Sequence, residues 1–349
     1  MKTIKVEASV SYEVQIGSGL LMGCGERIRA VTPRAVRCVL VMDDTVAPLY
    51  AERVERELAD AGYECARFVI PSGEQSKNAE SFIRLLNFCA DFRLTRTDLI
   101  AALGGGVVGD LAGFAAASYM RGVSFVQLPT TLLAAVDSSV GGKTAIDLDA
   151  GKNLAGAFYQ PSLVLCDYDT LATLRPEVFT DGCAEVIKYG VLGDEALFAH
   201  LEQRGQDFDT EYVIARCVEM KRDIVNADEF ETGCRRLLNL GHTLGHVVEK
   251  RSGFALSHGR SVAIGLAAVA HSAASEGICT PECAERIIRC LRRFGLPTET
   301  EYGLDELYDI MLSDKKRSGD SVSIIVPEKI GACRVEPMPV ARAKEFFAH

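Results

Sequence analysis

The first half of the chain alternates between short apolar runs and segments with helical periodicity. Residues 1–17 alternate between apolar and polar positions, which predicts an opening hairpin. Apolar runs bounded by turn residues predict strands at residues 36–42, 65–70, 99–103, 124–128 and 163–166. Helical patterns lie between them, at about 46–61 and 78–92 and again after residue 106. This order predicts a mostly parallel sheet with covering helices.

The second half carries almost no strand signal until residue 321. Helical patterns occur at residues 180–191, 195–204, 211–227, 235–251, 259–276 and 281–294, and a late hairpin is predicted at 323–326 and 333–335. We therefore expect two domains, which are an α/β domain over residues 1–170 and a mostly α-helical domain over residues 171–349.

Composition and charge narrow the classes of function. Hydrophobic residues make up 48% and charged residues 25% of the chain, as in ordinary globular proteins. A net charge of −10 argues against a nucleic-acid binder but permits a small anionic substrate, because local basic clusters decide that. The 12 cysteines are scattered, as expected for reduced thiols in the cytoplasm. The sequence starts without a signal-peptide core and has no apolar run of ~20 residues, so we expect no membrane association.

Three of the six histidines lie within residues 235–259. His242 and His246 are four residues apart, so they would share one face of a helix over 235–251. Neutral imidazoles at this spacing often hold a divalent metal, although the pair also suits an ordinary polar helix face. Thr243 follows His242, which excludes the His-Glu-x-x-His pattern of zinc proteases. A third histidine, His258, beside Gly259 favours a site.

Charged residues near this region extend the hypothesis. Glu185 and Lys188 are three residues apart, a spacing that suits a surface ion pair. Apolar residues flank both, so the alternative is a partly buried carboxylate that completes a two-histidine metal site. Arg235 precedes His242 by seven residues. On one helix the two side chains would project to the same side, about 10 Å apart, so Arg235 is a candidate to face a ligand at the metal.

Two glycine-rich segments favour phosphate or nucleotide binding. Residues 104–110 match the G-x-G-x-x-G pattern after a strand, where glycines allow the backbone to approach a pyrophosphate at a helix N-terminus. The pattern follows the third strand and lacks an acidic residue about 20 positions later. The hydroxyls of a bound dinucleotide would therefore be held elsewhere, and Asp43 and Glu74 are candidates. A turn that binds nothing is the alternative.

The second segment, residues 137–144, is similar to a P-loop. Its leading glycine is replaced by Ser138, so an ATPase is a poor interpretation. Its glycines and small polar residues, with Lys143, Lys152 and Asn153, still favour an anion-binding loop.

Taken together, these stretches resemble the 3-dehydroquinate synthases, a family of sugar-phosphate cyclases, nearly end to end. The motifs that carry the resemblance are Gly73-Glu74-Gln75, residues 104–110, Tyr119-Met120-Arg121-Gly122-Val123, residues 129–134, residues 137–143, Gly151-Lys152-Asn153, residues 184–190, Leu238-Asn239-Leu240-Gly241-His242, Gly245-His246 and His258-Gly259. Small departures occur at Arg260-Ser261 and Phe158-Tyr159-Gln160.

The resemblance implies a fold and an activity. It implies a Rossmann-like, NAD-binding N-terminal domain, an α-helical metal- and substrate-binding C-terminal domain, an active site in the cleft between them, and a homodimer. It implies a lyase that converts 3-deoxy-D-arabino-heptulosonate 7-phosphate to 3-dehydroquinate and phosphate in the shikimate pathway, which leads to chorismate and the aromatic amino acids. The implied cofactors are NAD, used catalytically, and a divalent metal, zinc or cobalt.

The resemblance also implies roles for individual residues. The metal ligands would be Glu185, His242 and His258, which leaves His246 to handle the substrate phosphate or a proton. The catalytic residues would be Lys143, Lys188, Glu185, His246, Asn239 and Arg235. The substrate would contact Arg121, Asp137, Lys143, Asn153, Lys188, Lys221, Arg235, Asn239, His246 and one of Lys315 or Lys316. NAD would contact Asp43, Ser72, Gly73, Glu74, Gln75, Lys77, Gly104, Gly105, Gly106, Gly109, Asp110, Thr130, Thr131, Asp137, Lys143 and Lys152.

Three other functions remain open. Another sugar-phosphate cyclase would share the metal and NAD sites and differ at the substrate positions, where Arg121, Asn239 and His246 keep the dehydroquinate pattern. A metal-dependent polyol dehydrogenase would share the architecture but would not need paired anion sites. A non-catalytic sensor of metal and nucleotide would not need Lys143, Lys188 and Arg235.

Overall fold

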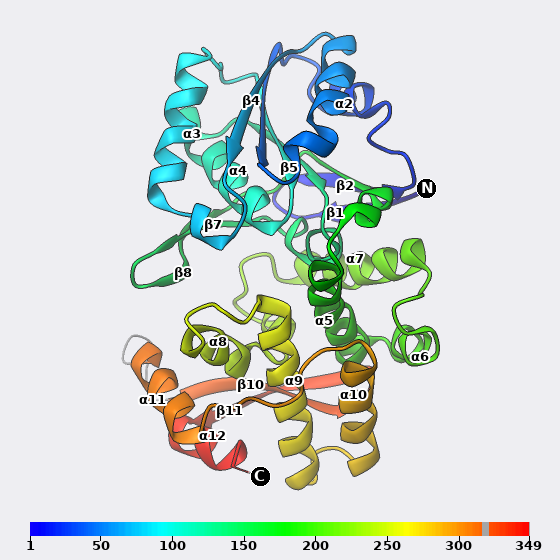
Figure 1. Cartoon of the computed structure of the whole chain (residues 1–349), viewed down its shortest axis with the longest axis vertical. Coiled ribbons are helices and arrows are strands. Elements are labelled where there is room, and N and C mark those ends of the chain that lie inside the picture. The colour runs from blue at the N-terminus through cyan, green and yellow to red at the C-terminus, as the bar shows by residue number, and fades with distance from the viewer. Residues whose placement is uncertain (316–320, 349) are drawn as a thin grey trace. The chain divides into compact units, whose positions relative to one another are not determined.

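The computed structural model describes residues 1–315 and 321–348, and the chain forms two compact units (Figure 1). The first unit consists of Met1–Leu174 together with Thr210–Phe230. The second unit consists of Arg175–Asp209 and the chain from Glu231 onward.

The first unit is built on a seven-stranded sheet in the order β1-β2-β9-β6-β5-β3-β4. Only β1 runs antiparallel to its neighbour β2, and the other pairs are parallel, as the alternating pattern predicts. The strands are β1 (Lys2–Glu7), β2 (Ser11–Gly17), β3 (Arg37–Asp43), β4 (Glu64–Ile70), β5 (Leu99–Gly104), β6 (Ser124–Pro129) and β9 (Leu163–Asp167).

Helices cover both faces of this sheet because its central strands are apolar on both sides. In β3, Cys38, Leu40 and Met42 pack in one cluster with α1 (Cys24–Val31) and α2 (Ala47–Asp60). The alternate residues Val39 and Val41 pack in the opposite cluster with α3 (Ala79–Asp91) and α4 (Gly106–Ser118). Successive strand residues point to opposite faces, so one apolar run supplies both cores.

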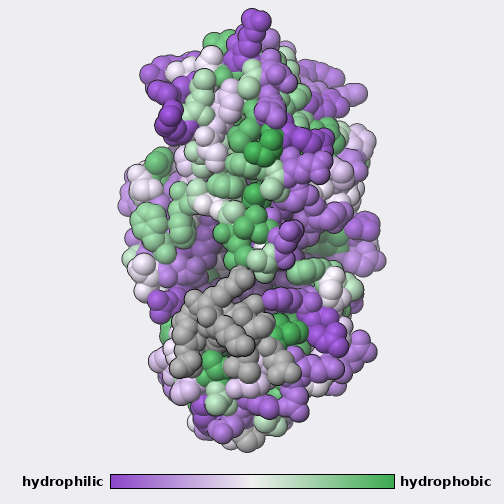
Figure 2. Space-filling model, turned by 90° about the vertical axis from the view of Figure 1, so that its left-hand side faces the viewer, coloured by the Kyte–Doolittle hydropathy of each residue, from purple (hydrophilic) through white to green (hydrophobic). Residues whose placement is uncertain are grey.

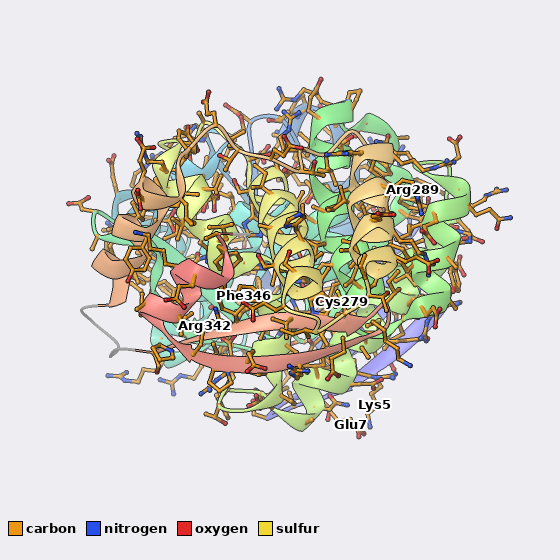
Figure 3. All side chains as sticks on the ribbon, turned by 90° about the horizontal axis from the view of Figure 1, so that it is seen from below. Lys5, Glu7, Cys279, Arg289, Arg342 and Phe346 are labelled. Atoms are coloured by element: carbon orange, nitrogen blue, oxygen red, sulfur yellow. The ribbon has the colours of Figure 1, made fainter. Side chains whose placement is uncertain are left out.

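The edge strand β1 carries charges on its outer side. Lys5 and Glu7 point away from the unit and pair with each other at 2.7 Å between Nζ and Oε1 (Figure 3). Charged side chains on an edge strand oppose uncontrolled pairing with other chains.

Helix α7 (Thr210–Ala227) belongs to the first unit, whereas the sequence assigned everything after residue 170 to one helical domain. The backbone N–H of Glu7 donates to Oδ1 of Asn226 at 2.8 Å, and Ser9 donates from its N–H and its hydroxyl to Glu229 at 2.7 and 2.6 Å. These bonds tie the end of α7 to the β1–β2 turn. Contacts between positions so distant in sequence leave no periodic signal.

A second hairpin, β7 (Lys143–Leu148) and β8 (Gly151–Phe158), carries Lys143, Lys152 and Asn153, which the sequence analysis placed in an anion-binding loop with residues 137–142. The expectation of a loop was wrong for these three residues, whereas residues 139–142 before β7 lie in a turn. The strands were hard to predict because β8 is only partly buried and contains glycines instead of an apolar alternation.

The second unit is mostly helical, as predicted. Its helices are α5 (Pro176–Gly193), α6 (Glu195–Arg204), α8 (His242–Arg251), α9 (His258–Ser275), α10 (Pro281–Arg293), α11 (Leu304–Lys315) and α12 (Val340–Phe346). The predicted late hairpin is present as β10 (Ser321–Lys329) and β11 (Ala332–Pro339). Figure 3 shows α12, marked by Arg342 and Phe346, beside this hairpin, and Cys279 at the turn between α9 and α10.

The predicted helix over residues 235–251 is broken, which corrects the sequence analysis. Cys234–Asn239 form a short 3₁₀ turn, and α8 begins only at His242. Gly241 between them has φ of 80°, a left-handed conformation that glycine adopts without strain. A Cβ at this position would lie 2.9 Å from the backbone O of Val262, so close packing against α9 also requires glycine.

Among the described residues, no helix has both the length and the hydropathy needed to cross a bilayer. On the face shown in Figure 2, hydrophilic residues are interspersed with smaller groups of hydrophobic ones.

Candidate active site

Three helices of the second unit bring together one carboxylate and two imidazoles. Glu185 lies on α5, His242 is the first residue of α8, and His258 is the first residue of α9. Oε1 of Glu185 lies 3.4 Å from Nε2 of His242 and 3.3 Å from Nε2 of His258. One ligand atom from each residue lies within 4.8 Å of the others. The trio is therefore compact enough to surround a single ion.

Glycines allow the helices to approach closely enough to form this cluster. A Cβ on Gly259 would lie 2.0 Å from the backbone O of Asp181 on α5, and a Cβ on Gly265 would lie 1.9 Å from the backbone O of Gly241. Neither contact leaves room for a side chain. The start of α9 is also tied to α5, because the carboxylate of Asp181 accepts hydrogen bonds from the hydroxyl of Ser257 and from the N–H of Arg260.

The chemistry of the three side chains fits a divalent metal. Glu185 is fully buried and forms an ion pair with Lys188, which is also buried. Nδ1 of His242 lies 3.1 Å from the backbone O of Leu240, so a proton on Nδ1 would leave the lone pair of Nε2 directed toward Glu185. One carboxylate oxygen and two imidazole nitrogens are a common ligand set for a catalytic zinc ion, which keeps a further position for water or substrate.

Burial and neighbouring charges shift the pKa values of the two histidines in opposite directions. Burial lowers the pKa of His242 to about 3, so its imidazole is neutral at neutral pH. Burial also disfavours the charged form of His258, but the neighbouring carboxylates of Glu185 and Glu249, at 3.3 and 3.7 Å, outweigh this and raise its pKa to about 10. A metal that binds to His258 must therefore displace a proton.

His246 lies beside the cluster. Its ring centroid is 5.2 Å from that of His242, as the spacing of four residues predicts, and the side chain is exposed. His246 belongs to a second group of possible ligands with His258 and Glu249. Glu249 was missed by the sequence analysis, because an acidic residue three positions after a histidine has no distinctive pattern.

Arg235 and Asn239 lie on the 3₁₀ turn that precedes α8. The proposed alignment of Arg235 and His242 on one helix was wrong, since the helix is interrupted at Gly241. Arg235 is nevertheless only 1% exposed, which excludes a solvated surface role. Nδ2 of Asn239 donates to Oε1 of Glu231 at 2.8 Å, and Glu231 was also absent from the predicted residues.

In the first unit, the glycine-rich turn joins β5 to α4 as predicted. The N-terminus of α4 has no side-chain cap among the described residues, so its first N–H groups are available to an anion. Gly105 packs against Thr131, whose Cγ2 would lie 3.0 Å from an added Cβ. Thr130 is buried and Thr131 is partly buried beside this turn.

Several predicted nucleotide-binding residues meet around one buried amine. Nζ of Lys77 lies 2.9 Å from Oε1 of Glu74, 3.1 Å from Oδ2 of Asp110 and 2.7 Å from Oδ1 of Asn153. Burial raises the pKa of Asp110 to about 6, although the charge of Lys77 opposes this. Lys152 joins the group at 3.5 Å from Glu74.

Other predicted residues have separate roles in the first unit. Lys221 on α7 donates to the backbone O of Asp137 at 2.6 Å and to its carboxylate at 2.9 Å. Asp43 accepts hydrogen bonds from the N–H groups of Thr45 and Val46, just before α2. Lys143 is exposed at the start of β7. The side chain of Lys315 and the whole of Lys316 lie outside the described residues.

Comparison with known proteins identifies the family. Residues 67–181 match the 3-dehydroquinate synthase N-terminal family, and residues 182–317 match the 3-dehydroquinate synthase C-terminal family. The 3-dehydroquinate synthase of Desulforamulus reducens is 46% identical over 341 residues, which cover 95% of each chain. The enzyme of that name from Bradyrhizobium diazoefficiens is 46% identical, with 95% of this chain and 92% of that protein covered. The chain belongs to the 3-dehydroquinate synthase family.

A solved structure extends the comparison. The 2-epi-5-epi-valiolone synthase of Streptomyces hygroscopicus subsp. jinggangensis 5008, which was solved with NAD⁺ and Zn²⁺ bound, is 27% identical to this chain. The two structures superpose with a TM-score of 0.88 and cover 99% of this chain and 97% of that one. The fold is thus that of the sugar-phosphate cyclases, with a parallel α/β N-terminal part and a helical C-terminal part, as the 3-dehydroquinate synthase resemblance implied.

Proposed function

We propose that the chain converts 3-deoxy-D-arabino-heptulosonate 7-phosphate to 3-dehydroquinate and phosphate, as a phosphate-eliminating carbon–oxygen lyase of the shikimate pathway. The similarity to enzymes named for this activity, at 46% identity over 95% of the chain, is the observation that carries the proposal. The cluster of Glu185, His242 and His258, whose ligand atoms lie close enough to bind one metal ion, is consistent with this proposal.

Glu185, His242 and His258 are proposed to hold a divalent metal, with zinc as the first choice and cobalt as a substitute. Their buried carboxylate and paired imidazoles support this assignment. NAD is proposed to bind at the glycine-rich turn before α4, with its polar groups held by the residues near Lys77 and by Asp43. When bound, the metal supplies Lewis acidity toward a substrate hydroxyl, and NAD supplies a hydride acceptor that is regenerated.

The protein's own residues would bind and orient an anionic substrate. Arg235 offers a guanidinium that can hold a carboxylate through two parallel hydrogen bonds. Lys188 supplies a positive charge next to Glu185, and His246 is placed beside the cluster to accept or donate a proton. The further contacts proposed for the substrate are Arg121, Asp137, Lys143, Asn153, Lys221 and Asn239.

The test is an assay of the purified protein with the heptulosonate phosphate, a catalytic amount of NAD and zinc. Phosphate and dehydroquinate should appear in equal amounts, and NADH should not accumulate. Stoichiometric NADH without phosphate release would instead indicate a polyol dehydrogenase. Phosphate release without dehydroquinate, with a different sugar phosphate preferred, would indicate another cyclase of the group.

We also propose that the chain acts as a cytoplasmic homodimer. Light scattering of the purified protein measures its mass in solution, and a mass of one chain at assay concentration would contradict the dimer. Fractionation of the source cells would test the compartment.

A further inference from the structure

Glu249 is a buried carboxylate that faces the cluster from α8. It is 3% exposed and lies among the buried residues Val247 and Val248. Its Oε2 atom lies 3.7 Å from Nδ1 of His258. A buried carboxylate is costly to desolvate unless a partner compensates it, so its position beside an imidazole calls for a physical explanation.

The two nitrogens of His258 face different carboxylates. Nε2 lies 3.3 Å from Oε1 of Glu185, on the side of the proposed ion, and Nδ1 faces Glu249 on the other side. A neutral imidazole has one N–H and one lone pair. If Glu249 accepts the N–H of Nδ1, the lone pair is left on Nε2, where a metal needs it.

The other histidine of the cluster is already held in this manner. Nδ1 of His242 has the backbone O of Leu240 at 3.1 Å, which fixes its ring without a carboxylate. Nδ1 of His258 faces the charged side chain of Glu249 instead, at 3.7 Å, which is an ion-pair distance somewhat longer than a hydrogen bond. A carboxylate that accepts the Nδ1–H makes the imidazole more basic than a carbonyl does.

We propose that Glu249 is a positioning residue that orients His258 through its Nδ1–H and so strengthens metal binding by Nε2. The inference rests on the proposed metal site and assigns Glu249 no contact with substrate. It predicts that the metal affinity depends on Glu249 even though Glu249 is not a ligand.

A second metal ion is the competing explanation, since His246, Glu249 and His258 also have ligand atoms within 4.8 Å of one another. Two ions would have to share His258, which would then carry no N–H and become an imidazolate. His246 is exposed, and a single ion leaves a proton for Glu249 to accept. These points favour positioning, and the number of bound ions separates the two explanations.

The experiment measures zinc affinity by competition with a chelator for the wild type, Glu249→Gln and Glu249→Ala. The alanine variant should bind zinc roughly 10–100-fold more weakly. The glutamine variant keeps a neutral acceptor and should lose less. Glu202→Gln is the control, because Glu202 pairs with Arg286 at 2.6 Å on other helices of the same unit. It removes an equal charge and should leave the affinity unchanged.

The affinity is compared at pH 7 and pH 9. Loss of the Glu249 charge would also weaken the proton affinity of His258, and less competition from protons would by itself tighten metal binding at pH 7. Thermal unfolding of the metal-free variants checks folding, and the glutamine variant keeps the test valid if the alanine variant does not fold. Wild-type protein should bind one equivalent of zinc, and the cobalt-loaded glutamine variant should show a shifted ligand-field spectrum.

Two results would contradict the role proposed for Glu249 and leave the proposed metal site intact. One is an affinity within twofold of wild type for both Glu249 variants at both pH values. The other is two equivalents of zinc in the wild type and one in Glu249→Gln, which would make Glu249 a ligand of a second ion. Wild-type protein that binds no divalent metal would overturn the proposed metal site and this inference together.

Discussion

Nε2 of His258 lies 3.3 Å from Oε1 of Glu185, although the two residues belong to different helices that are distant in sequence. This pair joins the first turn of α9 to the middle of α5. Nε2 of His242, on a third helix, lies 3.4 Å from the same oxygen. The carboxylate of Glu185 is thus the point at which three helices converge.

Glu185→Gln should therefore remove most metal binding. The amide keeps the size of the side chain but loses the negative charge that an ion and both imidazoles face. We expect an affinity for zinc at least roughly 100-fold below that of the wild type, measured by chelator competition and elemental analysis. Glu276→Gln, which removes a carboxylate paired with Arg342 at 2.5 Å, is the control. Wild-type metal content in Glu185→Gln would contradict the proposed ligand set.

Metal binding should become tighter as the pH rises from 6 to 9. In the metal-free protein the pKa of His258 is raised to about 10, so a proton must leave for each ion bound. The apparent dissociation constant should fall by up to about tenfold per pH unit in this range. Calorimetry in buffers of different ionisation enthalpy measures the released proton. A dissociation constant independent of pH would contradict this coupling.

The same raised pKa acts in the opposite direction on the stability of the metal-free protein. His258 binds its proton more tightly in the folded state, so its contribution is fully present below about pH 6.5 and is lost as the pH rises through about 10. Chelator-treated protein should lose stability over this window while zinc-bound protein does not. Urea unfolding at several pH values measures the difference.

The sequence predicted the sheet well because β3 and β5 are nearly continuous apolar runs. The prediction that Glu185, His242 and His258 are metal ligands came only from the family resemblance, since the local pattern pointed first to His242 and His246; the structure brings the three side chains together. The broken helix at Gly241 escaped prediction because a single glycine within helical periodicity gives a weak signal, while the packing against α9 that needs it is not local. Glu249 escaped prediction because an acidic residue near a histidine has no distinctive pattern and its partner His258 lies on another helix.

Gly259→Ala should disturb both stability and metal binding. An added Cβ would lie 2.0 Å from the backbone O of Asp181, so α9 would have to move away from α5 and carry His258 with it. We expect a loss of about 2–4 kcal/mol in the free energy of unfolding, comparable to severe overpacking. Gly303→Ala is the matched control because nothing lies within 4 Å of its added Cβ. Equal stability of the two variants would show that the helices can separate freely.

Arg235→Lys tests whether a buried guanidinium binds the substrate. Arg235 is 1% exposed on the turn before α8, so its role cannot be that of a solvated surface charge, even though the single helix expected to align it with His242 is absent. Lysine keeps the charge but loses the two parallel donors that fit a carboxylate. We expect kcat/KM to fall at least roughly tenfold, equivalent to about 1.4 kcal/mol of transition-state binding, with metal content unchanged. Arg236→Lys, at the exposed neighbouring position, should keep wild-type kinetics. If Arg235→Lys also kept them, the guanidinium would serve the packing of the turn and the substrate carboxylate would be bound by other residues.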